Sequence, residues 1–248
     1  MNLRQTFLIA GIIMLLAVMG YSGYRLWDIY SNRASEVTVR NQMLVYRPTI
    51  PHSDDTPAQQ SDPVVNQSII NLQYNHQSSV GWLSIPNTWV DHPFVQGQDN
   101  SFYLHRDINH NALHAGTIFM DYRNCYNFSD FNTLIYGHNM NNGSMFGTLP
   151  YFTNQSFFEE NNVGYVFLPY QTYELQIFAV AIIRPYDRII YGQNFETTES
   201  REYFIDYVRR IALHYQDIDV TKEDRFVTLS TCRNDAANYR LVVIGVIA

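Results

Sequence analysis

The sequence predicts a mostly β domain, either a closed barrel or a sandwich, that follows an apolar N-terminal helix. From Val80 onward, short runs rich in Val, Ile, Thr, Tyr and Phe recur between Gly, Pro, Asn or Asp residues. One amphipathic stretch interrupts them near the C-terminus, and an uncharged apolar run lies close to the N-terminus. Hydrophobic residues make up 46% of the 248 residues, so the chain can build one core of good size.

The apolar run at the N-terminus covers residues 7–27 and has no charged residue before Arg25. A helix needs about 20 residues to cross a bilayer, and Tyr21 and Tyr24 stand where an interfacial aromatic belt would lie. No small-x-small site closes the run cleanly, so we favour an uncleaved signal anchor over a cleaved signal peptide or a soluble core helix. We therefore expect residues 1–29 to hold a cytoplasmic start and a single-pass transmembrane anchor, with the rest of the chain extracytoplasmic at the cell membrane.

Residues 30–65 are expected to form an extracytoplasmic linker or stalk. Their second half, residues 47–63, is rich in proline and small polar residues, which is typical of a segment with little regular structure. After it, Ile69 and Leu72 recur at helical spacing and predict a short helix that leads into the main domain. That domain is expected to cover residues 66–248.

Eight strands and one helix are predicted within this domain. The strands cover residues 80–86, 90–96, 115–121, 132–139, 164–170, 173–185, 225–232 and 239–248. The helix covers residues 197–218, where Phe204, Val208 and Tyr215 lie on one apolar face and Thr197 or Thr198 can cap the start. Eight strands at this spacing are typical of a barrel or a sandwich.

Charge and motif content exclude several classes of function. The chain has 16 Lys and Arg against 23 Asp and Glu, a formal net charge of −7, which argues against binding to nucleic acid. No pair of Cys or His residues has the spacing of a metal site, and no glycine-rich phosphate loop is present. No metal and no cofactor are therefore predicted.

One of the two cysteines is a candidate nucleophile. Cys232 ends a predicted strand within the sequence TLSTC, whereas Cys125 lies in a polar, loop-like stretch. A disulfide between them is not favoured, because exported proteins that use disulfides seldom stop at one in a domain of this size. A free thiol is mostly protonated at neutral pH, so a reactive Cys232 needs a base or a cation nearby.

His138 and Arg240 could supply these groups. Among the eight histidines, His138 stands out because it lies at the end of a predicted strand, in the sequence YGHN, as Cys232 ends its own strand. Arg240 opens the last strand, and a hairpin would return it to the neighbourhood of Cys232, where a guanidinium can stabilise a developing oxyanion. Taken singly, each residue also has a simple structural interpretation, as a capping histidine and a solvent-facing arginine.

Together these residues resemble the sortases, the membrane-anchored cysteine transpeptidases of Gram-positive bacteria. TLSTC resembles the TLxTC signature with Cys232 at the nucleophile position, YGHN resembles the histidine signature with His138, and Arg240 resembles the strand arginine. Residues 81–107 and 115–147 are most similar to class B, which also has an amphipathic helix before the cysteine strand. The resemblance covers about residues 66–248.

The resemblance implies an eight-stranded sortase-type β-barrel with an N-terminal helix and a helix inserted before the cysteine strand. It also implies that Cys232 attacks a carbonyl in a C-terminal sorting motif of an exported protein and forms a thioacyl intermediate. His138, as imidazolium, would protonate the leaving amine, and Arg240 would hold the oxyanion or align the motif. An amine of a peptidoglycan precursor would then resolve the intermediate, or a pilin lysine if the enzyme polymerises pilins. The family needs no cofactor.

The same resemblance implies three substrate-binding residues, Asn100, Leu104 and Ser230. One position departs from the family, because many class B members carry an acidic or neutral residue directly after the cysteine and this chain carries Arg233. A cation beside the thiol favours the thiolate. We expect Arg233 to change which sorting motif is accepted and to leave the chemistry intact.

Two other classes of protein fit the sequence less well. L,D-transpeptidases place His and Gly immediately before the cysteine, where this chain has Ser230 and Thr231, and papain-like enzymes place the cysteine before the histidine. A tethered β domain that only binds a partner would make the set of His138, Cys232 and Arg240 a coincidence. The sequence therefore favours a sortase.

Overall fold

The computed structural model describes residues 3–50, 65–232 and 238–247. It divides into two compact units, residues 1–42 and residues 43–248, which are described separately. Residues 51–64 of the linker predicted at residues 30–65 lie outside the described residues, and so do the departure at Arg233 and the side chain of Cys232. The domain boundaries expected from the sequence stay predictions.

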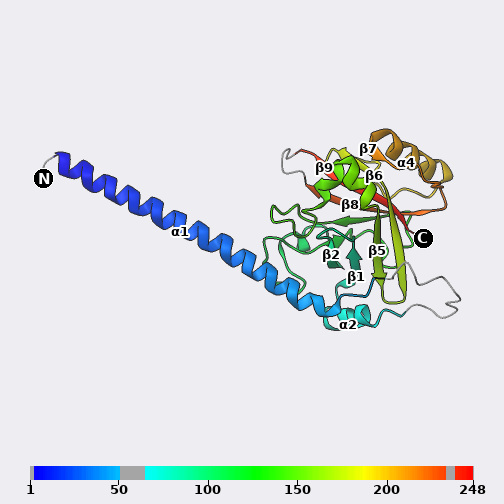
Figure 1. Cartoon of the computed structure of the whole chain (residues 1–248), viewed down its shortest axis with the longest axis horizontal. Coiled ribbons are helices and arrows are strands. Elements are labelled where there is room, and N and C mark those ends of the chain that lie inside the picture. Colours follow the sequence, from blue (N-terminus) through cyan, green and yellow to red (C-terminus); the bar gives the residue numbers. More distant parts are fainter. Residues whose placement is uncertain (1–2, 51–64, 233–237, 248) are drawn as a thin grey trace. The chain divides into compact units, whose positions relative to one another are not determined.

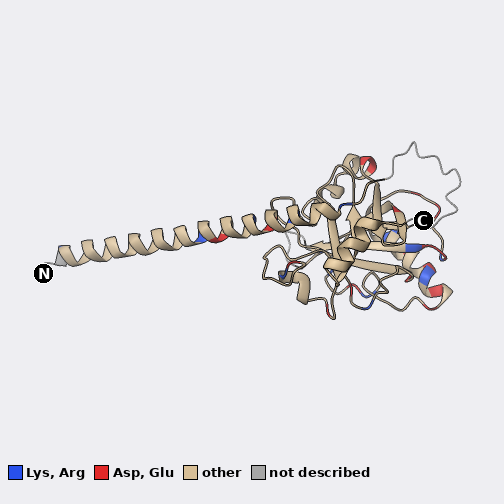
Figure 2. Ribbon diagram, turned by 90° about the horizontal axis from the view of Figure 1, so that it is seen from below, with Lys and Arg blue, Asp and Glu red and all other residues tan. Residues whose placement is uncertain are grey.

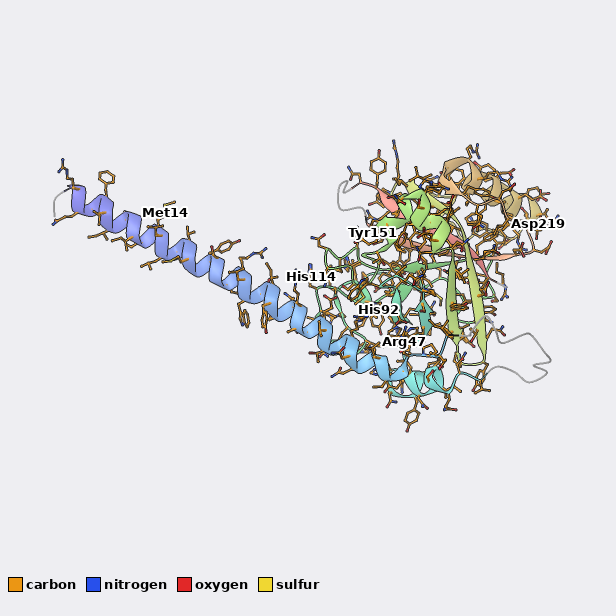
Figure 3. The ribbon with its side chains drawn as sticks, viewed as in Figure 1. Met14, Arg47, His92, His114, Tyr151 and Asp219 are labelled. Carbon is orange, nitrogen blue, oxygen red and sulfur yellow. The ribbon has the colours of Figure 1, made fainter. Side chains whose placement is uncertain are left out.

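The first unit consists of one long helix, α1 (Leu3–Met43). It continues beyond the apolar run through residues expected to be a stalk, because the chain has no proline before Pro48 to interrupt it. Figure 2 shows a long stretch of α1 without charged residues, and its apolar side chains are exposed, as Met14 illustrates in Figure 3. By length and composition α1 could cross a membrane, and no other helix among the described residues meets that test.

The second unit is a β-barrel with short helices around it. Its strands are β1 (Ser79–Ser84), β2 (Asp91–Gln96), β3 (Phe119–Met120), β4 (Asn132–Tyr136), β5 (Val163–Leu168), β6 (Gln171–Ile183), β7 (Ala212–Tyr215), β8 (Arg225–Cys232) and β9 (Arg240–Ile247). Its helices are η1 (Leu44–Tyr46), α2 (Gln67–Asn75), η2 (Phe102–His105), η3 (Leu149–Thr153), α3 (Gln155–Glu160) and α4 (Thr198–Ile211).

Eight of the strands close into a ring. The order β5-β1-β2-β3-β4-β8-β9-β6 ends where it began, because β5 also pairs with β6. Most neighbours are antiparallel, but β2 with β3 and β4 with β8 are parallel. The expected fold class, an eight-stranded barrel with a helix inserted before the cysteine strand, is confirmed (Figure 1). The short strand β7 pairs with β6 outside the ring.

Alternation along the strands separates two hydrophobic cores. In β8, Val227 and Leu229 belong to the cluster inside the barrel, whereas Phe226 belongs to a second cluster that includes Phe204 and Val208 of α4. Side chains two residues apart share a face of a strand, so β8 is buried on both sides. The outer face of the barrel is thus covered by α4, which lies alongside β6 and β7 in Figure 1.

The helix predicted over residues 197–218 is shorter than expected. It ends at Ile211, and residues 212–215 form β7, in which Tyr215 pairs with Ala179 of β6 and packs edge-on against Phe178. Tyr215 therefore belongs to a strand and not to the apolar face of the helix. Pairing with an available strand has overridden the helical periodicity of this segment. Of the two possible caps, Thr197 is the one used, since its hydroxyl accepts from the Ser200 amide at 3.2 Å.

Candidate active-site groove

A groove of about 1060 Å³ lies at the ends of β4, β8 and the start of β9. One wall comes from the segment that enters η2, and the opposite wall comes from residues 185–188 and 191–194 of the connection between β6 and α4. Among the residues that line it are His138, Ser230 and Arg240. Three strand ends and two connections, far apart in sequence, therefore form one site.

Cys232 and Arg240 are brought together by the hairpin of β8 and β9. The two residues are direct partners in the antiparallel register, as the sequence predicted. The Arg240 guanidinium donates through Nη1 to the carbonyl oxygen of Tyr239 at 3.2 Å, and the side chain is half-buried at the groove. A cation is thus held at the strand position opposite the candidate nucleophile.

His138 reaches the same place through the parallel pair of β4 and β8. Tyr136 pairs with Ser230, the Gly137 amide donates to the Ser230 carbonyl at 3.2 Å, and the Thr231 hydroxyl donates to the Gly137 carbonyl at 2.7 Å. The last pair of β4 and β8 is Tyr136 with Ser230, and His138 and Cys232 each lie two residues beyond it. The pairings of β4, β8 and β9 thus bring the segments that carry the three residues to neighbouring strand ends.

The tautomer of His138 follows from its partner. Its Nε2 lies 2.7 Å from the carbonyl oxygen of Leu104, which can only accept, so Nε2 carries the hydrogen and Nδ1 is the acceptor of a neutral ring. Burial is the main cause that lowers the pKa of His138 below its usual 6.5, and His105 and His114 lower it further, against an opposing contribution from the Leu104 hydrogen bond. The lowered pKa favours the neutral ring of His138 at pH 7.

His105, which the sequence did not single out, lies at the site. Its ring stacks on the His138 ring with 5.4 Å between centroids and an interplanar angle of 27°. His114, labelled in Figure 3, lies in the connection between η2 and β3. Spacing alone offered no signal for this contact, because it depends on η2 folding back over the end of β4.

The three expected substrate-binding residues all line the groove, but their polar groups already make different hydrogen bonds within the protein. Both ends of the Asn100 amide are used within the protein, since Nδ2 donates to Asp121 at 2.9 Å and Oδ1 accepts from the Tyr122 amide at 3.1 Å. The carbonyl of Leu104 holds His138. The Ser230 hydroxyl pairs with the hydroxyl of Tyr191 at 2.8 Å, and each of these two groups can both donate and accept.

Sequence reasoning missed a polar cluster that supports the groove. Asp121 is fully buried and accepts hydrogen bonds from Arg123, Asn100 and Tyr136. Burial alone would raise its pKa, and these hydrogen bonds outweigh burial and lower it. The only sequence signal was an Asp and an Arg two residues apart, at the end of a predicted strand.

Comparison with known proteins places the chain in a family. Residues 83–248 match the Sortase domain family. Sortase B of Listeria monocytogenes is 32% identical over 240 residues, which cover 94% of this chain and 93% of that protein.

Solved structures agree with this match. The Staphylococcus aureus sortase B–substrate complex superposes with a TM-score of 0.69 and 31% identity, covering 74% of this chain and 86% of that one. Sortase B from Bacillus anthracis in complex with AAEK1 superposes with a TM-score of 0.73 and 30% identity, covering 90% of this chain and 99% of that one. The barrel fold and the match to sortases together identify the protein as a transpeptidase enzyme. The chain belongs to the sortase family, and its relatives are of class B.

Proposed function

We propose that this sortase cleaves a C-terminal sorting motif of exported proteins through a thioacyl intermediate on Cys232 and transfers the acyl group to an amine of a cell-wall precursor. The observation that carries the proposal is the convergence of three strand ends on one groove: Arg240 is the register partner of Cys232, and His138 and Arg240 both line the groove. The S. aureus relative was solved as a sortase B–substrate complex, which supports binding of a substrate by this kind of barrel.

In the first step, the neutral His138 accepts the thiol proton of Cys232 at Nδ1. The thiolate attacks the scissile carbonyl carbon, and Arg240 stabilises the resulting oxyanion with its guanidinium hydrogens. The imidazolium of His138 then gives its proton to the leaving nitrogen as the C–N bond breaks. A thioester on Cys232 remains, and the C-terminal fragment of the substrate departs with a free amine.

In the second step, the acceptor amine attacks the thioester carbonyl. Its surplus proton passes through His138 to the departing sulfur of Cys232, so that a new amide forms and the free thiol returns. The hydroxyl pair of Ser230 and Tyr191 faces the groove, and such groups are suited to bind the backbone of the motif. Leu104 acts through its carbonyl on His138, and Asn100 holds the groove wall.

The experiment uses the full chain in detergent micelles and a panel of quenched peptides with sorting-like motifs. Cleavage by the wild type and by Cys125→Ala, together with its loss in Cys232→Ala, supports the proposal. Cleavage retained in Cys232→Ala contradicts it. Acceptors are compared in separate arms, a wall-type peptide amine and a lysine-bearing pilin-type peptide, since a preference for the lysine would indicate the alternative function of pilin polymerisation.

We further propose that α1 anchors the enzyme in the cell membrane with the barrel outside. The uncharged, exposed stretch of α1 at residues 5–24 supports this placement. In a Gram-positive host, the N-terminal peptide of residues 5–25 should be recovered from the membrane fraction, and protease added to protoplasts should digest the barrel. A mature protein that lacks this peptide would identify a cleaved signal, and a protected barrel would contradict the orientation.

A further inference from the structure

One fully buried carboxylate lies behind the groove and is not among the residues that line it. Asp121 follows β3 and has an exposed fraction of 0%. Its charge is balanced by Arg123, whose Nε lies 2.8 Å from Oδ1 and whose Nη2 lies 2.6 Å from Oδ2. A buried charge without its partner is strongly destabilising, so a buried carboxylate needs an ion-pair partner and hydrogen-bond donors for its oxygens.

Oδ1 of Asp121 also accepts from the Arg123 amide at 3.0 Å, and Oδ2 accepts from two separate parts of the groove lining. Oδ2 accepts from Asn100 Nδ2 at 2.9 Å, which fixes the segment that enters η2, and from the Tyr136 hydroxyl at 2.9 Å, which fixes the end of β4. The η2 segment carries Leu104, whose carbonyl sets the position and tautomer of His138. Asp121 is thereby connected to the candidate catalytic histidine through the backbone of that segment.

Arg123 extends the same network to the opposite wall. Its Nη2 also donates to the carbonyl of Tyr191, 68 residues further along the chain, at 3.2 Å. The Tyr191 ring stacks on Tyr136 with 6.2 Å between centroids, and its hydroxyl bonds to Ser230. The connection between β6 and α4 is therefore held against the barrel by groups that converge on one carboxylate.

We propose that Asp121 is a positioning residue that sets the width of the groove by holding these three walls together. It receives its hydrogen bonds from groups of the protein, and its side chain is closed off from a substrate. Replacement by Asn removes the charge and replaces one of the two acceptor oxygens by an NH2 group, which can only donate. Arg123 then loses its fixed position, and the wall at residues 190–193 loses one of its links to the barrel, the hydrogen bond from Arg123 to Tyr191.

The test measures the wall directly by amide hydrogen exchange in the full chain in detergent micelles, so it does not depend on the proposed reaction. Asp121→Asn is expected to speed exchange in residues 189–193 by about tenfold or more, on the scale of one charged hydrogen bond. The matched control is Asp91→Asn, because Asp91 also pairs with an arginine (Arg47, 2.7 Å) and with Trp82 Nε1 (2.8 Å) but does not line the groove. That variant should leave exchange in residues 189–193 at the wild-type rate.

Kinetics give the second readout. Cleavage by Asp121→Asn should show a raised KM as well as a reduced kcat, since both substrate walls and His138 lose support, whereas Asp91→Asn should keep both constants. If Asp121→Asn does not fold, Tyr136→Phe removes one hydrogen bond to the same carboxylate without a change of charge, and a smaller effect in the same direction is expected. Unchanged exchange in residues 189–193 in every Asp121 or Tyr136 variant that folds would overturn the proposal, even if no peptide is cleaved by the wild type.

Discussion

Replacing Gly137 by alanine should displace His138 and slow catalysis while the protein stays almost entirely folded. Gly137 lies between the last residue of β4 and His138, and a Cβ built there would lie 2.8 Å from two atoms of the Phe146 ring. Phe146 is fully buried, so the ring has little room to withdraw. The backbone at Gly137 must therefore move away from the core, and His138 moves with it.

The size of the effect follows from this overlap. Overpacking of a core side chain costs about 1–3 kcal/mol of unfolding free energy. A misplacement of about 1 Å in a reacting group can cost about 100-fold in rate, and Gly137 is the residue next to a histidine that is held by a 2.7 Å hydrogen bond. We expect kcat/KM to fall by about 100-fold, whereas the folded population at 25 °C stays nearly complete.

The matched control is Gly245→Ala in β9. A Cβ there would lie 2.5 Å from Leu175 Cδ1, within the barrel and away from the groove. It should lose a similar unfolding free energy, measured by urea titration of tryptophan fluorescence, and keep its rate of peptide cleavage. Adding Phe146→Leu to Gly137→Ala should restore activity in part. Wild-type cleavage by Gly137→Ala, or an equal loss of activity in Gly245→Ala, would refute the reasoning.

Three further predictions concern pH and stability. Because burial lowers the pKa of His138 below 6.5, the acid limb of the pH profile of kcat/KM should have its midpoint below pH 6.5; a midpoint above pH 6.5 would contradict this. The pKa of Asp121 is lowered below 3.8, so the stability it contributes is present above pH 3.8 and is lost as the pH falls through the lower folded value; acid unfolding of Asp121→Asn should therefore be less steep in that window, and an unchanged slope would argue against the shift. Thr197→Ala should cost about 1 kcal/mol of unfolding free energy because it removes the cap of α4, and an equal cost for Thr198→Ala would show that the cap has no special role.

The strands of the barrel could be predicted because their signal is local. Runs of β-branched and aromatic residues between turn residues carry it, and each of the eight predicted runs contains a strand. The strand β7 could not be predicted, because its residues continue a helical pattern and only the open edge of β6 converts them to a strand. The full length of α1 was not predicted. The helix continues to Met43 because no proline interrupts it before Pro48, whereas the polar composition of residues 30–43 indicated a stalk.

The candidate site was predictable where a motif marks a strand end. Cys232, His138 and Arg240 each stand at such an end, and the register brings their backbones together. The polar cluster of Asp121 and Arg123 behind these residues was not predictable. The contact of Arg123 with Tyr191, for example, spans 68 residues and exists only after the barrel closes. Long-range polar contacts of this kind leave no periodicity in the sequence.

The most direct test of the central claim is the covalent intermediate itself. The full chain is incubated with a cleaved sorting-type peptide without an acceptor amine, and intact-protein mass spectrometry followed by peptide mapping locates the adduct. The account predicts a hydroxylamine-labile acyl adduct of the N-terminal peptide fragment on Cys232, absent in Cys232→Ala and unaffected by Cys125→Ala. Cleavage without any adduct on Cys232, or an adduct on the exposed Cys125 in its place, would contradict it.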